Sequence, residues 1–285
     1  MDRFTPAIDI ALGIGESPLW DDRRQALWFV DILAPAIFLL DPAGGTPARF
    51  AMPDLVTSLG LCADGRLVVA LRSGVHLFDP VGGALDFLVH PEPDRPMNRL
   101  NDGKVGPDGC FWVGSMHDAI PRQPTAALYR VTPGGRVDKV LDGLKVSNGL
   151  AWSGDGRTMY HADSRGPDVT AYPFDPTTGA MGQGCILARL TEEQGLPDGA
   201  AVDVDGFYWS AGVTGGCLNR IAPDGTIAEV IPLPAPAPTM PCFGGPALDR
   251  LYVTSLATDR TGRAVGGTLL VGDPGVAGVP VGRFG

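Results

Sequence analysis

The chain has little of what binding to nucleic acids or membranes requires. Lysine and arginine number only 22 against 32 aspartate and glutamate residues, and the formal net charge is −10. A protein that binds the phosphate backbone needs a positively charged surface, so no nucleic-acid partner is expected. No run of about 18 apolar residues occurs, and residues 1–15 lack the apolar core of a signal peptide. We therefore expect no membrane partner and a cytoplasmic location.

Cysteine is scarce and shows no pattern. The chain has five cysteines, an odd number, and they do not form the short paired spacings that mark zinc sites. Neither a disulfide framework nor a cysteine-based zinc site is therefore expected. We expect reduced and mostly buried thiols at Cys62, Cys110, Cys185, Cys217 and Cys242.

The patterns of helices and of several enzyme classes are missing as well. Apart from a short turn at Thr191–Gln194, no segment carries apolar residues at helical spacing over about 11 residues. The chain has no G-x-S-x-G elbow, no Walker loop and no glycine-rich fingerprint followed by a helix. A serine hydrolase of the elbow type is therefore not expected.

The chain does contain enough apolar residues for a large core and many residues that favour turns. Hydrophobic residues make up 44% of the 285 residues and charged residues only 19%, which excludes a disordered protein. The 40 glycines and 27 prolines follow no collagen-like period, so tight turns between short elements explain them best. This composition favours an all-β protein.

A turn pattern recurs six times along the chain. Its aspartates are about 43 to 50 residues apart, close to the length of one four-stranded propeller blade. Each turn precedes an apolar, strand-like run, and a second run ends in a further turn, so each unit reads as strand, turn, strand, turn, strand. The recurring turns are Asp21–Arg24, Ala63–Arg66, Pro107–Cys110, Gly154–Arg157, Val204–Phe207 and Ala247–Arg250.

The repeat predicts a six-bladed β-propeller with a central channel. Six near-equal units fit a closed ring better than the alternatives for this composition, a β-sandwich or two small β domains. The units fill the whole length, and no linker of distinct composition separates them. We therefore expect residues 1–285 to form a single domain.

Residues at a fixed offset from the turn are expected to meet at the axis, because the first strand of every blade lines the channel. In the first unit, Glu16 lies six positions before Asp22. Seven positions before the turn aspartate, the second to sixth units carry Thr57, Asn101, Asn148, Asp198 and Cys242. Oxygen ligands and amide groups therefore predominate at this level of the channel.

Three of these residues, Glu16, Asn148 and Asp198, form the candidate metal site. Asn148 and Asp198 are each followed by glycine, which lets the backbone approach the axis without a Cβ clash. Two carboxylates and one amide oxygen from separate blades make a partial oxygen shell that is open to water. Such a shell suits one divalent metal ion and does not distinguish calcium, zinc, manganese, magnesium and Fe(II).

Six motifs in order give the chain a family resemblance that covers nearly its whole length. GESPLW, RLNDGKVGPDG, WVGSMHD, SNGLAWSGDGRTMYHADS, LPDGAAVDVDGFYW and PCFGGP together resemble the SMP-30/gluconolactonase/LRE family of regucalcin-like lactonases. The resemblance implies a six-bladed propeller with one divalent cation at Glu16, Asn148 and Asp198. It also implies hydrogen bonds to the substrate from Arg99 and Asn101.

One departure from the family pattern affects the expected substrate. Where animal regucalcins carry an acidic pair after the third strand, this chain has His117 and Asp118 in SMHD. This segment resembles bacterial pentonolactonase-like members, which implies a xylono- or arabinolactone at least as readily as gluconolactone. His117 is a candidate substrate contact. Arg99 and Asn101, two residues apart on a strand, share one face.

These observations predict a lactonase that uses one divalent metal ion to hydrolyse a sugar-acid lactone to its aldonic acid. The metal would polarise the carbonyl, and Asp198 is the candidate general base because it lies within reach of the attacking water. Two alternatives stay open: an esterase or phosphotriesterase-like hydrolase of the same fold, and a non-catalytic ligand-binding propeller. We expect a monomer or weak oligomer whose partner is the small-molecule sugar lactone.

Overall fold

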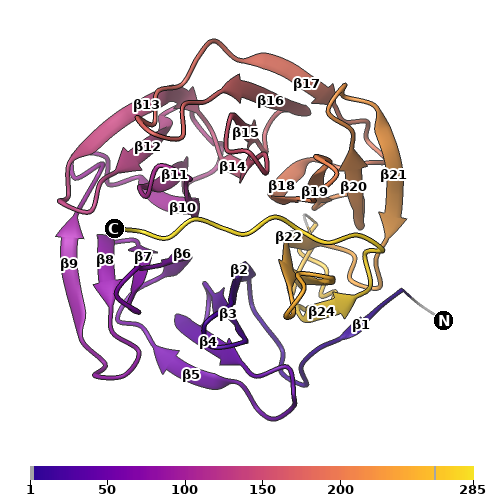
Figure 1. Cartoon of the computed structure of the whole chain (residues 1–285), viewed down its shortest axis with the longest axis horizontal. Helices are drawn as coiled ribbons and strands as arrows, with labels where there is room; N and C mark the ends of the chain where they lie inside the picture. Colours follow the sequence, from indigo (N-terminus) through magenta and orange to yellow (C-terminus); the bar gives the residue numbers. More distant parts are fainter. Residues whose placement is uncertain (1–2, 260) are drawn as a thin grey trace.

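The computed structural model describes residues 3–259 and 261–285, and within them the chain forms six four-stranded antiparallel sheets. The sheets stand around a common axis as the blades of a propeller, and Figure 1 shows them along that axis. The predicted all-β, six-bladed propeller is confirmed. No helix in this described part of the chain is long and apolar enough to cross a membrane.

The strands of blades 1 to 5 follow one another from the axis outward. Blades 1 and 2 contain β2 (Gly15–Asp21), β3 (Ala26–Asp31), β4 (Ala36–Leu40), β5 (Ala48–Ala51), then β6 (Val56–Leu61), β7 (Leu67–Leu71), β8 (Gly74–Phe78) and β9 (Leu85–Val89). Blades 3 and 4 contain β10 (Asn98–Val105), β11 (Phe111–His117), β12 (Ala126–Val131), β13 (Val137–Leu144), then β14 (Ser147–Trp152), β15 (Thr158–Asp163), β16 (Asp168–Pro173) and β17 (Cys185–Arg189). Blade 5 contains β18 (Pro197–Val202), β19 (Tyr208–Gly212), β20 (Cys217–Ile221) and β21 (Ile227–Pro232).

Blade 6 combines strands from both ends of the chain and so closes the ring. From the axis outward it contains β22 (Pro238–Gly244), β23 (Arg250–Ser255), β24 (Leu269–Gly272) and β1 (Phe4–Pro6). The last two strands are antiparallel, with Phe4 opposite Gly272 and Pro6 opposite Leu270. The sequence pattern did not predict this closure by the N-terminal strand.

The outermost strand of each blade was also missed, because the repeat predicted three strands in each unit. These strands are largely exposed: Ala48–Ala51 has no buried residue, and in Ile227–Pro232 only Ile231 is buried. A strand that packs on one side only lacks the continuous apolar run by which the inner strands were recognised.

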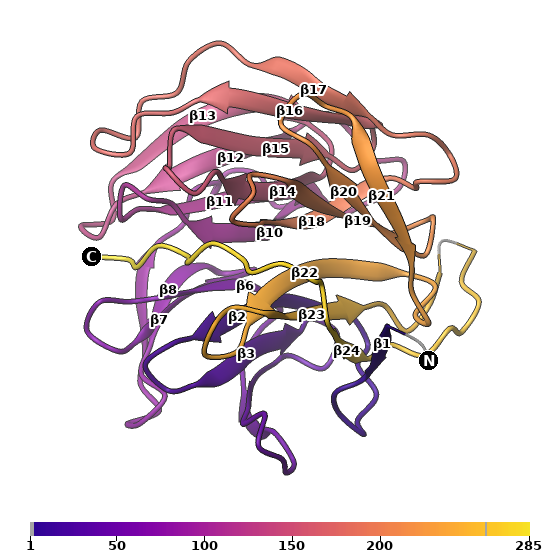
Figure 2. The same cartoon turned by 45° about the vertical axis from the view of Figure 1, so that its right-hand side comes forward.

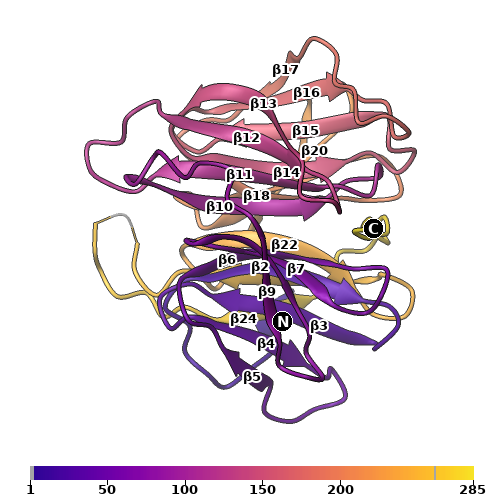
Figure 3. The same cartoon turned by 90° about the vertical axis from the view of Figure 1, so that its left-hand side faces the viewer.

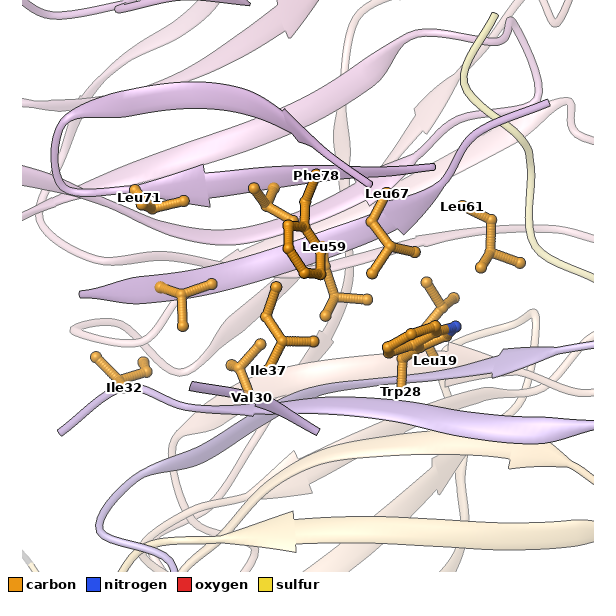
Figure 4. Close-up of a cluster of buried hydrophobic side chains, with 12 residues drawn as sticks. Leu19, Trp28, Val30, Ile32, Ile37, Leu59, Leu61, Leu67, Leu71 and Phe78 are labelled. Carbon is orange, nitrogen blue, oxygen red and sulfur yellow. The ribbon is translucent and has the colours of Figure 1, made fainter. Parts of the chain in front are cut away.

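Apolar packing between blades holds the innermost strands in place. All six residues of β3 and all five of β7 are buried, as expected for strands covered on both faces. Figure 4 shows the layer between blades 1 and 2, in which Trp28 and Val30 lie near Leu59 and Leu67.

The five cysteines are free thiols, and all except Cys185 on β17 are buried, in line with the expectation of mostly buried thiols.

The C-terminal residues 276–285 form an extended strap across one end of the channel. We call the end where the innermost strands begin the front mouth, and the end where they finish the back mouth. The strap crosses the back mouth, as Figure 2 shows, and Figure 3 places the C-terminus at that end of the axis. Its backbone N–H groups donate to Val202 O from Val279 (3.1 Å) and to Leu61 O from Phe284 (2.8 Å). The strap therefore ties blade 5 to blade 2.

Phe284 anchors the strap, and its removal is expected to destabilise the fold. The side chain is 4% exposed and packs between blades 2 and 3. Phe284→Ala should lower the free energy of unfolding by about 3 kcal/mol, because the truncation loses apolar burial and leaves a cavity. Urea denaturation followed by tryptophan fluorescence measures the change.

The control for this prediction is Phe87→Ala. Phe87 lies on the outermost strand β9 and is 62% exposed. Its truncation removes the same ring and should change the free energy of unfolding by roughly 0.5 kcal/mol or less. Equal losses in the two variants would show that the strap contributes no packing energy.

Candidate functional site

Five of the positions predicted to face the axis lie early in the innermost strands. Glu16, Thr57, Asn148 and Asp198 are each the second residue of their strand, and Asn101 is the fourth residue of β10. These strands all begin at the front mouth. Residues at the same offset from the turn therefore lie at the same depth in the channel. The structure therefore brings the candidate metal ligands and Asn101 to the same mouth.

Blade 6 departs from the predicted offset. Cys242 lies late in β22 and lines a cavity of about 200 Å³ under the strap, at the back mouth. The second residue of β22 is Thr239, so the count is wrong by three residues in this blade. The turn after β22 has the same five residues as the turns of blades 2 to 5, but Asp249 is its last residue rather than its third. This turn also contains Gly245 and Leu248, both with positive φ (87° and 54°).

A register shift occurs near the start of every innermost strand. Against the second strand of its blade, the pairing skips from Glu16 to Leu19 and from Asn148 to Ala151. The other four blades have a shift at the corresponding place. A β-bulge leaves residues unpaired, bends the strand and redirects its side chains. The bulges therefore turn side chains from separate blades toward the axis.

The residues after Asn148 and Glu16 have the positive φ that their bulges require. Gly149 has a φ of 71°, and a Cβ there would meet the Tyr208 hydroxyl at 2.6 Å, so no larger residue fits without a shift. In blade 1 the residue after Glu16 is Ser17, with a φ of 49°. Its hydroxyl accepts a hydrogen bond of 3.0 Å from Leu59 N in the next blade, which compensates the strained backbone.

A chain of hydrogen bonds joins four of the predicted site residues. Arg99 Nη1 donates to Asn101 Oδ1 (2.9 Å), and Asn101 Nδ2 donates to Asn148 Oδ1 (2.9 Å). Asn148 Nδ2 donates to Asp198 Oδ1 (2.6 Å) and to Ser164 Oγ (2.6 Å). The N–H groups of Asn148 are thus engaged, which leaves its amide oxygen as the group that faces the channel with a free lone pair.

Negative charge is concentrated below the front mouth. Burial, followed by the charges of Asp198 and Asp102, raises the pKa of Glu16 well above its usual range. Burial and the charge of Asp102 do the same to the pKa of Asp198, against the opposing effect of Arg99. Three carboxylates therefore lie within electrostatic range of one another in a poorly solvated channel.

Asp102 and Lys104 are channel residues that the offset did not select. Asp102 is 4% exposed; its Oδ2 accepts a hydrogen bond from Leu150 N (3.1 Å), while Oδ1 has no partner in the described residues. Lys104 Nζ donates to Ala200 O (2.7 Å), and burial lowers its pKa. Both belong to the NDGK segment: Asp102 lies within the bulge between Leu100 and Gly103, and Lys104 follows it.

Arg99 is held in place by residues from two blades. Its Nε donates to Asp118 Oδ1 (3.3 Å), and Asp118 Oδ2 accepts a hydrogen bond from Arg72 of blade 2. Arg72 and Asp118 each directly follow the second strand of a blade. Because the second strand ends where the first begins, a forward count from the turn could have selected both residues as neighbours of the site.

His117 lies at the end of β11, opposite Asn98 in the register. Its Nδ1 is 3.1 Å from Ala119 O, and with Asn98 and Arg95 it lines a pocket beside the front mouth. Arg99 is paired instead with Met116, so the two side chains leave the sheet on opposite faces. Contact of His117 with a substrate stays a prediction.

The candidate ligands fit a divalent cation by their chemistry. In residues 3–259 and 261–285, no three His, Cys, Asp or Glu side chains form a metal-binding group, so a set here has to include the amide of Asn148. Glu16, Asn148 and Asp198 supply two carboxylates and one amide oxygen, the ligands of a hard cation. Their charges are crowded, and Asp102 adds a buried carboxylate oxygen without a partner.

Comparison with known proteins identifies relatives over most of the chain. The family model of the SMP-30/Gluconolactonase/LRE-like region matches residues 14–257. The chain is 38% identical to 6-deoxy-6-sulfogluconolactonase of Pseudomonas putida over 249 residues, which cover 87% of this chain and 85% of that protein. It is 34% identical to regucalcin of Xenopus laevis, over 85% of this chain and 83% of the relative.

A solved structure confirms the architecture. The calcium-binding protein regucalcin of Agrobacterium tumefaciens superimposes with a TM-score of 0.91 at 28% identity, covering 98% of this chain and 96% of the other. The predictions of the family and of a lactonase-type enzyme are confirmed. By the match over residues 14–257, the chain belongs to the SMP-30/gluconolactonase/LRE-like family.

Proposed function

We propose that the protein hydrolyses a sugar-acid lactone, such as a xylono-, arabino- or gluconolactone, to the aldonic acid, with one divalent metal ion. The observation that carries this proposal is the convergence of two carboxylates and an amide oxygen at one mouth of the channel, beside Arg99 and Asn101. A relative named as a 6-deoxy-6-sulfogluconolactonase supports the lactone as the substrate class. A cytoplasmic monomer or weak oligomer remains our expectation.

Glu16, Asn148 and Asp198 are the residues that would hold the cation. The amide oxygen of Asn148 accepts one hydrogen bond from Asn101 and retains a second lone pair for a ligand role. A divalent cation at this site would polarise the lactone carbonyl, stabilise the developing oxyanion and offset the crowded carboxylates. Calcium, zinc, manganese, magnesium and Fe(II) stay as candidates, because oxygen ligands accept all of them.

Asp198 is the proposed general base. Lactone hydrolysis adds a water oxygen to the carbonyl carbon, breaks the ring carbon–oxygen bond and leaves a carboxylic acid and a hydroxyl. Asp198 accepts the proton that the attacking water loses and returns it to the ring oxygen as that bond breaks. Its hydrogen bond with Asn148 (2.6 Å) fixes the orientation of the carboxylate for both transfers.

Arg99 and Asn101 are the proposed substrate-binding residues, with His117 as a further candidate. Arg99 is oriented by Asp118 and Asn101, and its side chain is 10% exposed, so it is largely buried yet still open to the mouth. Fixed guanidinium and amide donors suit the hydroxyl groups of a sugar better than an apolar aryl ester or phosphotriester. The same polar residues also distinguish this channel from that of a non-catalytic propeller.

Chelation is expected to stop turnover. Treatment with EDTA should abolish hydrolysis of glucono-1,5-lactone and xylono-1,4-lactone, and one of the five candidate ions should restore it. Activity should also fall on acidification, because protons compete with the cation for Glu16 and Asp198. A pH-indicator assay near neutral pH against a buffer blank, with metal analysis of the same samples, measures both effects. Equal rates for metal-free and metal-loaded protein would refute the metal dependence.

Burial of Asp198, together with the nearby charge of Asp102, predicts that Asp198→Asn stabilises the metal-free protein. A carboxyl group whose pKa is raised on folding costs stability once the pH exceeds the pKa of the unfolded chain. Asparagine does not titrate, so the variant should have a higher free energy of unfolding than the wild type, by a margin that grows with pH. Urea denaturation in EDTA at pH 5 and pH 8 measures this margin.

With added metal, the wild type should have the higher free energy of unfolding, because Asp198→Asn lacks one charged ligand. A matched control is Asp86→Asn, at a carboxylate that is 68% exposed, for which the margin should stay small at both pH values. A margin for Asp198→Asn that is the same at pH 5 and pH 8 would show that folding does not raise the pKa of Asp198.

Arg99→Ala is expected to impair substrate binding and leave the metal in place. Within the described residues the Arg99 side chain makes no hydrogen bond to Glu16, Asn148 or Asp198. Loss of one charge-assisted hydrogen bond should lower kcat/KM by about tenfold to a hundredfold, mainly through KM. Steady-state kinetics and metal content test this, and a variant that lost its metal with an unchanged KM would reverse the assigned role.

A further inference from the structure

Arginines from three blades gather at the front mouth, although the protein as a whole is acidic. Arg72 follows β7 in blade 2, Arg99 lies in β10 of blade 3, and Arg122 lies between β11 and β12. Arg165, between β15 and β16 of blade 4, adds a fourth positive charge near Arg122. In a chain with a net charge of −10, this local reversal of sign indicates a negatively charged ligand.

Only one carboxylate bridges these arginines. Asp118 accepts hydrogen bonds from Arg72 and from Arg99 Nε (3.3 Å). In the described part of the chain, Arg122 has no carboxylate partner, and its Nη1 donates to the backbone oxygen of His117. Burial lowers the pKa of Arg122, the charge of Asp118 raises it, and Arg165 lowers it, so these charges lie within range of one another.

The cluster is open enough to receive a ligand. The side chains of Arg72 and Asp118 are 40% and 29% exposed, whereas that of Arg99 is 10% exposed. Each guanidinium has five N–H donors in a planar fork, and the single hydrogen bonds of Arg72 and Arg122 leave most of theirs for an oxyanion. Asp118 serves to orient the arginines that it bridges.

The arginines of the cluster outnumber the carboxylate that they share. Arg72 and Arg99 both donate to Asp118, and Arg122 donates to the backbone oxygen of His117, the preceding residue. Three guanidinium groups beside one carboxylate leave a surplus of two positive charges at the mouth. A neutral sugar lactone leaves that surplus unpaired, and an anionic one offsets it.

We propose that the preferred substrate is a sugar lactone with an anionic group, a sulfonate, phosphate or carboxylate, at the end remote from the lactone carbonyl, and that Arg72, Arg99 and Arg122 bind this group. The inference rests on the proposed function, because it assigns the lactone carbonyl to the metal site. Arginine recognises all three groups through paired N–H···O bonds, so the shared chemistry is that of a terminal oxyanion.

The test compares neutral and anionic lactones with metal-loaded enzyme. The substrates are glucono-1,5-lactone, 6-phosphoglucono-1,5-lactone, 6-deoxy-6-sulfogluconolactone and glucaro-1,4-lactone, which separate phosphate, sulfonate and carboxylate. At least one anionic lactone should have a kcat/KM about tenfold or more above that of the neutral lactone, the effect of one charge-assisted hydrogen bond. The readout is the ratio of the two kcat/KM values.

Variants of Arg122 show whether this preference comes from the cluster. Arg122→Gln should lower the ratio by about tenfold, and Arg122→Lys should retain part of it because the charge is kept. Arg136→Gln is the control: Arg136 is 69% exposed at the opposite end of blade 3 and should leave the ratio unchanged. A neutral lactone hydrolysed as well as every anionic one, with a ratio unaffected by Arg122→Gln, would overturn the inference and leave the proposed function intact.

Isothermal titration calorimetry with open-chain acids distinguishes failure of the proposed function from failure of the proposed anion site. If no lactone is hydrolysed, the proposed function fails, and the affinities for gluconate and 6-phosphogluconate still test the anion site. Tighter binding of 6-phosphogluconate that Arg122→Gln removes supports the site. Equal affinities for the two acids overturn it.

Discussion

The pairing of β1 with β24 joins the two ends of the chain in one blade and so closes the ring. Each other blade is continuous in sequence, whereas blade 6 takes its outermost strand from residues Phe4–Pro6. Phe4 is 2% exposed and packs with Leu270 between blades 5 and 6, so the seal has apolar contacts as well as hydrogen bonds. Glu16 of blade 1 and Asp198 of blade 5 stand on either side of blade 6. The N-terminal strand therefore completes the blade between them without contributing a side chain to the candidate site.

A closed ring permits an arrangement of charge that local structure alone would not sustain. Burying several carboxylates in one channel opposes folding, and the packing between blades has to outweigh that cost. The arginines lie above these carboxylates and Asp118 bridges two of them, so the channel is positive at its rim and negative below. On the proposed function, such a gradient orients a polar substrate as it approaches the candidate metal ligands.

The fold and most of the ring of channel residues could be predicted from the sequence because both depend on short-range order. The offset from the turn to the candidate ligand spans only one strand, so the positions of Asn148 and Asp198 in the channel could be found by counting alone. The count failed at Cys242 because Asp249 lies two residues later in its turn than the other turn aspartates and β22 is longer than the corresponding strands of blades 2, 4 and 5. Arg72 was not predicted because its contact with Asp118 joins residues 46 positions apart in neighbouring blades. Asp102 was not predicted because a bulge, invisible in the repeat, brings it to the channel.

The strap has a consequence for how substrate and product would move through the channel. Residues 276–285 lie across the back mouth, so the proposed function assigns both substrate entry and product release to the front mouth. On that proposal, the acid leaves by the opening through which the next lactone enters. A hydrolase of this design is therefore subject to product inhibition. In a channel open at both ends, substrate could enter at one mouth while product left at the other.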